Sequence, residues 1–214
     1  EENPYPRWVN TVLRLSPASI YEIIKEVKLK LLNHNVKEIE APDILVAGCG
    51  TGQHSINTAS RFKNSKVLAI DLSLSSLAYA KRKSEELALN NIEHMQADIL
   101  DISKIGKQFD IIESVGVLHH MDDPMTGWRV LVNCLKPGGL MRIGLYSEIA
   151  RQQIVKLRKE IKRLNFELSD DSMRSFRSDM ISSDGENLKA MRSVADIYSL
   201  SEWRDLLFHV KEHH

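Results

Sequence analysis

The run ILVAGCGTG at residues 44–52 places a short apolar segment directly before a glycine-rich turn. The apolar residues predict a buried strand, and the pattern that begins at Gln53 predicts a helix immediately after the turn. Glycine permits such a turn and lets a ligand approach the backbone, while a helix N-terminus offers unpaired N–H groups to an anion. The segment therefore predicts a nucleotide or carboxylate site, unless the glycines serve only a tight structural turn.

The same rhythm of short apolar runs and longer amphipathic stretches continues as far as residue 146. It is typical of βα units around a parallel sheet, and a chain of 214 residues suits one such α/β domain. The last helix of the series is expected to stop at the sequence KPGG, residues 136–139. The expected strands are residues 43–47, 66–70, 92–96, 109–114 and 140–146, and the expected helices are 53–62, 74–88 and 124–135.

Helices are also expected on both sides of this core. Before it, residues 16–33 have apolar side chains at helical spacing, with Ser16 as the N-cap and Pro17 in the first turn. After it, residues 148–166 form an amphipathic and strongly basic helix, and a polar stretch at 169–186 leads to weaker helices at 187–195 and 201–210. We therefore divide the chain into an N-terminal helical segment that packs on the core (1–40), the core (41–146), and a helical cap with the C-terminal segment (147–214).

Composition excludes several classes of protein. Lys plus Arg and Asp plus Glu both number 29, so no overall charge attracts nucleic acid or an anionic membrane, and no apolar run is long enough to cross a bilayer. Cys49 and Cys134 lack the spacing of a zinc site, which predicts free thiols, no metal and a cytoplasmic location. Because the chain lacks an initiator methionine, we expect it to be a piece of a longer polypeptide. His213 and His214 at its end are either the start of a purification tag or native sequence.

Two acidic residues follow the second and third predicted strands. Asp71 ends the second strand, where open α/β sheets bind ligands, and it could accept hydrogen bonds from ribose hydroxyls. Asp98 follows the third strand and could accept from an adenine amino group. Each could instead cap a helix or turn, but a glycine turn and two acids after three successive strands favour a shared nucleotide ligand. Gln53 stands where a dinucleotide fingerprint has its third glycine, which argues against NAD.

The motifs AGCGTG, AIDLS, QADI, FDIIESVGVLHH and LKPGG, which span residues 43 to 146, resemble the class I S-adenosylmethionine-dependent methyltransferases. The flanking sequences NPYPRW and YSLSEWRDLLFHV further resemble bacterial methyltransferase domains that follow tetratricopeptide repeats. The resemblance implies a three-layer, Rossmann-like α/β fold whose first five strands are ordered 3-2-1-4-5, with S-adenosylmethionine as cofactor. It also implies a tetratricopeptide-repeat region in the same polypeptide.

The resemblance also assigns roles to residues. The glycines would surround the methionine part of the cofactor, Asp71 and Leu72 the ribose, and Asp98 with Ile99 the adenine. Ser114, Val115 and also Val117 would lie beside the sulfonium, while the Cys49 side chain serves packing. The expected cofactor-binding residues are Gly48, Cys49, Gly50, Gly52, Asp71, Leu72, Asp98, Ile99, Ser114 and Val115.

The candidate catalytic residues are His119 and His120, which follow the fourth strand. A neutral imidazole could take a proton from an attacking amine or hydroxyl, because its pKa lies near operating pH. The alternative is that the pair belongs to the loop before the next helix, with one ring packed. Glu113 and Tyr146 are weaker candidates at strand ends.

Other side chains could contact an acceptor or a partner. The basic helix is more typical of a solvated face than of an RNA site, and the aromatic residues are more typical of core packing. These candidates are Arg174, Arg177 and Arg192 for an anionic substrate, and Tyr5, Trp8 and Trp203 for the acceptor site.

These observations favour methyl transfer from S-adenosylmethionine to an unidentified nitrogen, oxygen or carbon nucleophile. The alternative is a catalytically silent cofactor-binding or scaffolding module of a larger repeat protein, since no compelling acid or base stands out. A nicotinamide-dependent oxidoreductase is a third hypothesis, which Gln53 opposes.

Overall fold

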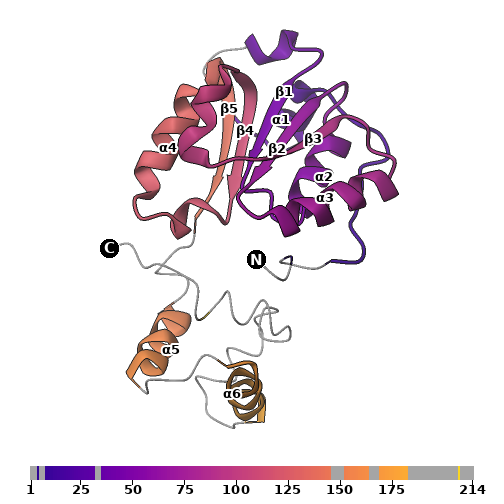
Figure 1. Cartoon of the computed structure of the whole chain (residues 1–214). Coiled ribbons are helices and arrows are strands. Elements are labelled where there is room, and N and C mark those ends of the chain that lie inside the picture. The colour runs from indigo at the N-terminus through magenta and orange to yellow at the C-terminus, as the bar shows by residue number, and fades with distance from the viewer. Residues whose placement is uncertain are drawn as a thin grey trace. The chain divides into compact units, whose positions relative to one another are not determined.

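The computed structural model describes residues 4, 8–31, 35–145, 152–163, 169–182 and 207. Its contacts divide the chain into two compact units, Glu1–Leu145 and Tyr146–His214. The first unit is a five-stranded sheet with helices on both faces (Figure 1). The second unit is described by itself.

All strand pairs in the sheet are parallel, and the strand order is β3-β2-β1-β4-β5. This confirms the predicted three-layer α/β fold and the order 3-2-1-4-5. The chain builds outward from β1 through β2 to β3 and then returns to β4 on the other side of β1, so the order reverses between β1 and β4. Ligands of open α/β sheets bind at such a reversal, beyond the carboxyl ends of the strands. The strands are β1 (Asp43–Ala47), β2 (Lys66–Asp71), β3 (Ile92–Gln96), β4 (Phe109–Val115) and β5 (Leu135–Gly144).

Two apolar layers hold the helices on the sheet. In β1 the side chains alternate, so Ile44 and Val46 pack with α1, α2 and α3, while Leu45 and Ala47 pack with η2, η3 and α4. Full burial of each Ile, Val or Leu side chain contributes about 1.5–3 kcal/mol to the stability of the fold. Figure 1 shows α2 and α3 on the opposite side of the sheet from α4. The helices are α1 (Ile20–Glu26), α2 (Gln53–Arg61), α3 (Leu74–Glu86) and α4 (Pro124–Asn133), with 3-10 turns η1 (Asn35–Glu38), η2 (Ile99–Ile105) and η3 (Leu118–His120).

The N-terminal helix is shorter than the predicted span of 16–33. Ser19, not Ser16, is its N-cap, and Ser19 forms a reciprocal capping box with Glu22. The residues before it are not helical, since Leu15 and Ser16 lie in a bend and Ala18 forms an isolated parallel bridge with Phe62 at the end of α2. The predicted N-cap at Ser16 was therefore wrong.

Strand β5 begins five residues earlier than the predicted span of 140–146. The KPGG sequence does not stop a helix, because α4 already ends at Asn133. Phe109 pairs with Leu135 and Ile111 with Leu140, so the Pro-Gly-Gly segment is an irregular insertion within an edge strand. Proline is tolerated there because an edge strand has one row of N–H groups without a ladder partner.

The second unit contains α5 (Gln152–Arg163) and α6 (Asp170–Ser182). Helix α5 lies within the predicted basic helix and buries Ile154, Val155 and Ile161. The stretch interpreted only as polar forms α6, whose Met173 is fully buried. Apart from Leu207, the weaker helices predicted at 187–195 and 201–210 lie outside the described residues. Among the helices described in either unit, none has the length and apolar character needed to cross a membrane.

Candidate functional site

The glycine turn joins β1 to α2 with Gly48, Gly50 and Gly52 at φ of 77°, 52° and 87°. This left-handed region strains any residue with a Cβ, which explains the glycines. The N–H groups of Gly48 and Cys49 both donate to the carbonyl of Ile70, each at 2.9 Å. The turn is therefore tied to the carboxyl end of β2.

Neighbouring segments approach two of these glycines closely. A Cβ on Gly48 would lie 2.4 Å from Cγ2 of Val117, in the loop after β4, and one on Gly52 would lie 2.6 Å from Cβ of Ala80 in α3. Such distances are shorter than van der Waals contact. The loop after β4 therefore packs directly against the glycine turn, and both lie where the strand order reverses.

Helix α2 begins at the turn without a side-chain cap, because its N-cap residue is Gly52. In contrast, Ser19, Ser73 and Asp123 cap α1, α3 and α4 through their side-chain oxygens. The first N–H groups of an uncapped helix, together with the helix dipole, favour an anion. The predicted anion site thus has its donors at the start of α2.

Asp71 ends β2 and is bonded to the glycine turn. One oxygen accepts from the N–H of Gly50 at 2.7 Å, and the other accepts from the N–H of Ser73 at 2.9 Å. Asp71 is not the N-cap of α3, since Ser73 has that role. A carboxylate has about four lone-pair sites, so capacity remains for two hydroxyl donors. The adjacent Leu72 is exposed.

Asp98 is the N-cap of η2, where its Oδ1 accepts from the N–H of Leu100 at 2.9 Å. This is the capping role that the sequence left open, and it leaves Oδ2 for a ligand donor. Ile99 is buried in the layer under α4 and η2. The amide of Gln96 donates to the carbonyl of Leu72 at 2.9 Å, which joins the segments after β2 and β3.

Ser114 and Val115 end β4. The Oγ of Ser114 is buried and has no hydrogen-bond partner among the described residues, which is a costly state for a hydroxyl. Val115 is partly exposed beyond it. A polar ligand atom near this strand end would satisfy Ser114.

His119 and His120 form the end of η3, with ring centroids 4.2 Å apart and planes inclined by 48°. His119 is buried at 6% exposure, whereas His120 is half-buried. The structure therefore packs one ring of the pair, as the alternative interpretation expected. His120 is therefore the better match of the two for a base that reaches an acceptor.

Residues 44–139 match a methyltransferase domain family. An uncharacterized protein of Synechococcus is 35% identical over 63% of this chain and 32% of its own length. The ubiquinone biosynthesis O-methyltransferase of Coxiella burnetii is 31% identical over 62% of this chain and 53% of its own length. The chain thus spans about a third of one relative and about half of the other.

Solved structures share the fold. PKMT2 from Rickettsia typhi, in complex with AdoHcy, has a TM-score of 0.63 at 20% identity, over 80% of this chain and 35% of that chain. An S-adenosylmethionine-dependent methyltransferase from Clostridium acetobutylicum has a TM-score of 0.50 at 26% identity, over 63% of this chain and 51% of that chain. The core therefore has the same Rossmann-like fold as these methyltransferases, and its residues 44–139 match a methyltransferase domain family.

Glu113 of β4 faces α2 and not the strand ends. Its carboxylate accepts hydrogen bonds from His54 Nε2 at 2.8 Å, from Thr58 Oγ1, and from Arg61 Nη2 at 3.0 Å. Burial alone would raise the pKa of Glu113, but His54, Arg61 and Thr58 lower it to about 2. The sequence analysis missed His54 and Arg61. The sequence signal for these residues was the helical spacing of the polar positions 54, 58 and 61 on a helix that packs against a sheet.

Trp8 is a packing residue at the edge of the glycine turn. Its Nε1 donates to the carbonyl of Thr51 at 3.0 Å, and its ring meets Tyr79 of α3 edge-on at a centroid distance of 6.1 Å. The Tyr79 hydroxyl donates back to the carbonyl of Trp8. The segment that precedes α1 thus contacts the core at the glycine turn.

The remaining candidates divide into three groups. Cys49 is buried, and burial followed by the charge of Asp71 raises the pKa of its thiol, so it remains protonated at neutral pH. Within the described ranges, no group of three His, Cys, Asp or Glu side chains could hold a metal ion. Arg174 and Arg177 lie on α6 in the second unit. Tyr5, Tyr146, Arg192 and Trp203 lie outside the described residues.

Proposed function

We propose that this chain binds S-adenosylmethionine at the glycine turn and transfers its methyl group to a nitrogen, oxygen or carbon nucleophile. The observation that supports it best is the uncapped N-terminus of α2 beside Asp71, at the reversal of the strand order. The match of residues 44–139 to methyltransferase domains supports the same proposal.

The residues present fit this cofactor. The N–H groups at the start of α2 suit its methionine carboxylate, and the remaining lone pairs of Asp71 suit its ribose hydroxyls. The unbonded Oδ2 of Asp98 suits the adenine amino group, and Ser114 offers a buried hydroxyl without a partner. When bound, S-adenosylmethionine supplies an activated methyl group, whose transfer needs alignment and exclusion of water more than a strong acid or base.

Within this proposal, His120 is the better candidate to accept a proton from the nucleophile, and His119 supports its ring. His120→Ala should lower turnover at saturating cofactor and leave the affinity for S-adenosylhomocysteine unchanged. His119→Ala should mainly lower the melting temperature. Equal turnover in both variants and the unmodified chain would remove the histidines from catalysis.

Calorimetry with S-adenosylhomocysteine tests the binding step, with Asp71→Ala as the control for the site. Absence of binding by the folded chain at millimolar ligand would overturn the proposal. Transfer of labelled methyl from S-adenosylmethionine to an acceptor in a metabolite and protein extract tests turnover. Binding without transfer would favour the silent cofactor-binding module, and competition by NADH would favour the nicotinamide alternative.

The likeness of the flanking motifs supports a further proposal, that tetratricopeptide repeats belong to the same polypeptide. Sequencing of the gene around this segment tests it. A gene without such repeats would refute it.

A further inference from the structure

Helix α2 presents three polar side chains to a single buried carboxylate. His54, Thr58 and Arg61 are spaced by four and three residues and therefore share one face of the helix. All three donate to Glu113 of β4, whose side chain is 4% exposed. Arg142 of β5 lies further away, with Nη1 at 3.8 Å from Oε1 of Glu113.

This cluster does more than satisfy a buried charge. Apolar residues of α2, such as Ile56 and Ala59, already attach the helix to the core. Apolar contacts are non-directional and allow a helix to shift or rotate at small energetic cost. Hydrogen bonds from two successive turns to one carboxylate are directional, so they fix the axial position and rotation of α2 against β4.

The contacts with Glu113 extend along α2 from its last residue, Arg61, to the end that forms the anion site. His54 is the second residue of α2, next to Gln53 and the N-cap Gly52. On the opposite side, Glu113 directly precedes Ser114, and the loop that follows β4 places Val117 against Gly48. The Glu113 cluster (Glu113, His54, Thr58 and Arg61) therefore joins the two segments that flank the strand reversal.

We propose that Glu113 is a positioning residue that sets the N-terminus of α2 at the distance from β4 which the methionine carboxylate of S-adenosylmethionine requires. The inference rests on the proposed function. Glu113 does not contact the ligand itself, because its carboxylate is turned toward α2. The negative charge of Glu113 distinguishes positioning from a direct electrostatic effect. Repulsion by this anion would weaken the binding of the ligand's carboxylate, whereas correct positioning of α2 strengthens that binding.

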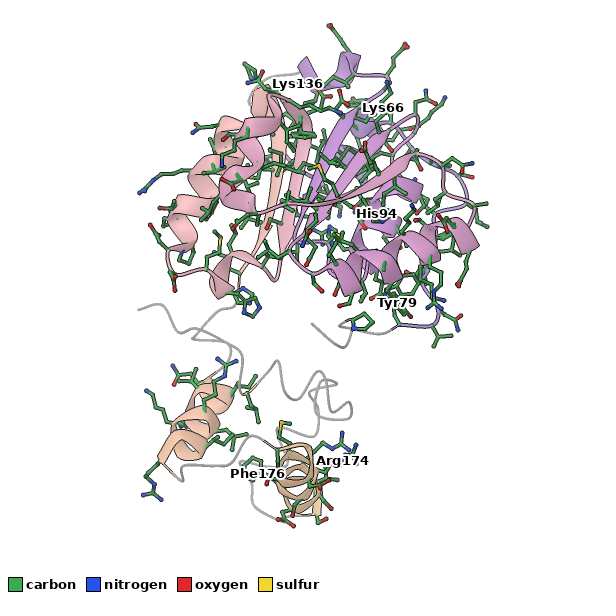
Figure 2. All side chains as sticks on the ribbon, viewed as in Figure 1. Lys66, Tyr79, His94, Lys136, Arg174 and Phe176 are labelled. Carbon is green, nitrogen blue, oxygen red and sulfur yellow. The ribbon has the colours of Figure 1, made fainter. Side chains whose placement is uncertain are left out.

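The chain offers a matched control on the same strand. Asp110 is also a buried carboxylate of β4, and it accepts from Lys136 Nζ at 2.9 Å and from the N–H of Asp43 at 2.8 Å. It lies at the amino end of the sheet, the end at which Figure 2 labels both Lys136 and Lys66, the first residue of β2. Asp110→Asn and Glu113→Gln therefore remove equivalent charges at opposite ends of β4.

The experiment compares these two variants for thermal stability and for affinity by calorimetry. Two ligands are used: S-adenosylhomocysteine, and 5′-methylthioadenosine, which lacks the methionine carboxylate. Both variants should melt at lower temperature than the unmodified chain. Only Glu113→Gln should weaken the binding of S-adenosylhomocysteine, by about tenfold or more. This is the scale expected for the loss of hydrogen bonds to a charged group. Its affinity for methylthioadenosine should stay within about twofold of the unmodified chain.

Thr58→Val keeps the test decisive if Glu113→Gln does not fold. It removes one donor from the cluster, preserves side-chain volume, and should weaken S-adenosylhomocysteine by about threefold to tenfold. Equal weakening in Asp110→Asn, equal weakening of both ligands, or unchanged affinity in both cluster variants would each overturn the positioning role. If the unmodified chain binds neither ligand, the proposed function itself fails and this inference fails with it.

Discussion

The contact between Gly48 and Val117 predicts the effect of placing a methyl group in the glycine turn. In Gly48→Ala the new Cβ would lie 2.4, 2.5 and 2.9 Å from Cγ2, Cγ1 and Cβ of Val117. All three are branch-point or terminal atoms of one short side chain, so no single rotation removes every clash. The residue would also keep a φ of 77°, a left-handed conformation unfavourable for alanine.

Two terms set the expected loss of stability. The left-handed conformation costs alanine about 1–2 kcal/mol, and overpacking of a filled site costs about 1–3 kcal/mol. Gly48→Ala should therefore lower the free energy of unfolding by about 2–5 kcal/mol. Gly106→Ala isolates the first term, because Gly106 has a φ of 67° and nothing within 4 Å of the position of a Cβ.

Urea denaturation of Gly48→Ala, Gly106→Ala, Val117→Ala and the double variant Gly48→Ala/Val117→Ala measures both terms. The double variant should recover about 1–3 kcal/mol relative to the sum of its single variants, since the two shortest contacts, with Cγ1 and Cγ2, are then removed and only the contact with Cβ at 2.9 Å remains. Equal losses in the two glycine variants, or no recovery in the double variant, would refute the steric reasoning. The contact would then be too soft to position the loop after β4.

Three other predictions follow from single contacts. Asp71→Ala should weaken the binding of S-adenosylhomocysteine by about 1–3 kcal/mol in calorimetry. The binding of an analogue without ribose hydroxyls should be weakened less. An equal loss of affinity for both ligands would leave Asp71 only its hydrogen bond to Gly50. Glu113 has a folded-state pKa of about 2, below its ordinary value of 4.5, so its contribution is present above that ordinary value and is lost as pH falls toward 2. Urea denaturation across this pH range should show up to about 3 kcal/mol of acid destabilisation in the unmodified chain that Glu113→Gln lacks. Parallel curves of stability against pH for the two proteins would contradict the role of the charged Glu113. Trp8→Phe should cost about 1 kcal/mol in thermal unfolding through loss of the hydrogen bond from Nε1 to the carbonyl of Thr51, and an unchanged melting temperature would show that this hydrogen bond is dispensable.

The sequence predicted β1 and β3 at their observed bounds because each is a short run between turn residues. It misplaced the start of β5, since the Pro-Gly-Gly sequence that stops a helix is also tolerated in an edge strand with an irregular register. Whether a strand lies at an edge depends on tertiary pairing. The N-cap predicted at Ser16 was wrong for the same reason, because the bridge between Ala18 and Phe62, which delays the start of the helix, is also a tertiary contact.

The candidate site was predictable where the backbone conformation dictates the residue. Glycines at three positive-φ positions and an acid at the end of β2 can be read from the sequence alone. The partners of Asp71 and Glu113 could not be predicted in this way. Strand alternation places Glu113 and Ser114 on opposite faces, but only the packed helices reveal that α2 covers the face of Glu113.

These contacts together fix the glycine turn before any ligand binds. The turn is bonded to Ile70 and Asp71, packed against Val117, and followed by a helix held through Glu113. Ordering the backbone of one residue costs about 1–2 kcal/mol, so a turn of five loose residues would weaken any ligand that had to order it. In this fold the turn is already ordered, so ligand binding does not have to supply that free energy. Variants of Glu113 and Val117, which hold the turn in place, should therefore change the affinity for S-adenosylhomocysteine, and the size of each change should follow how far the variant loosens the turn.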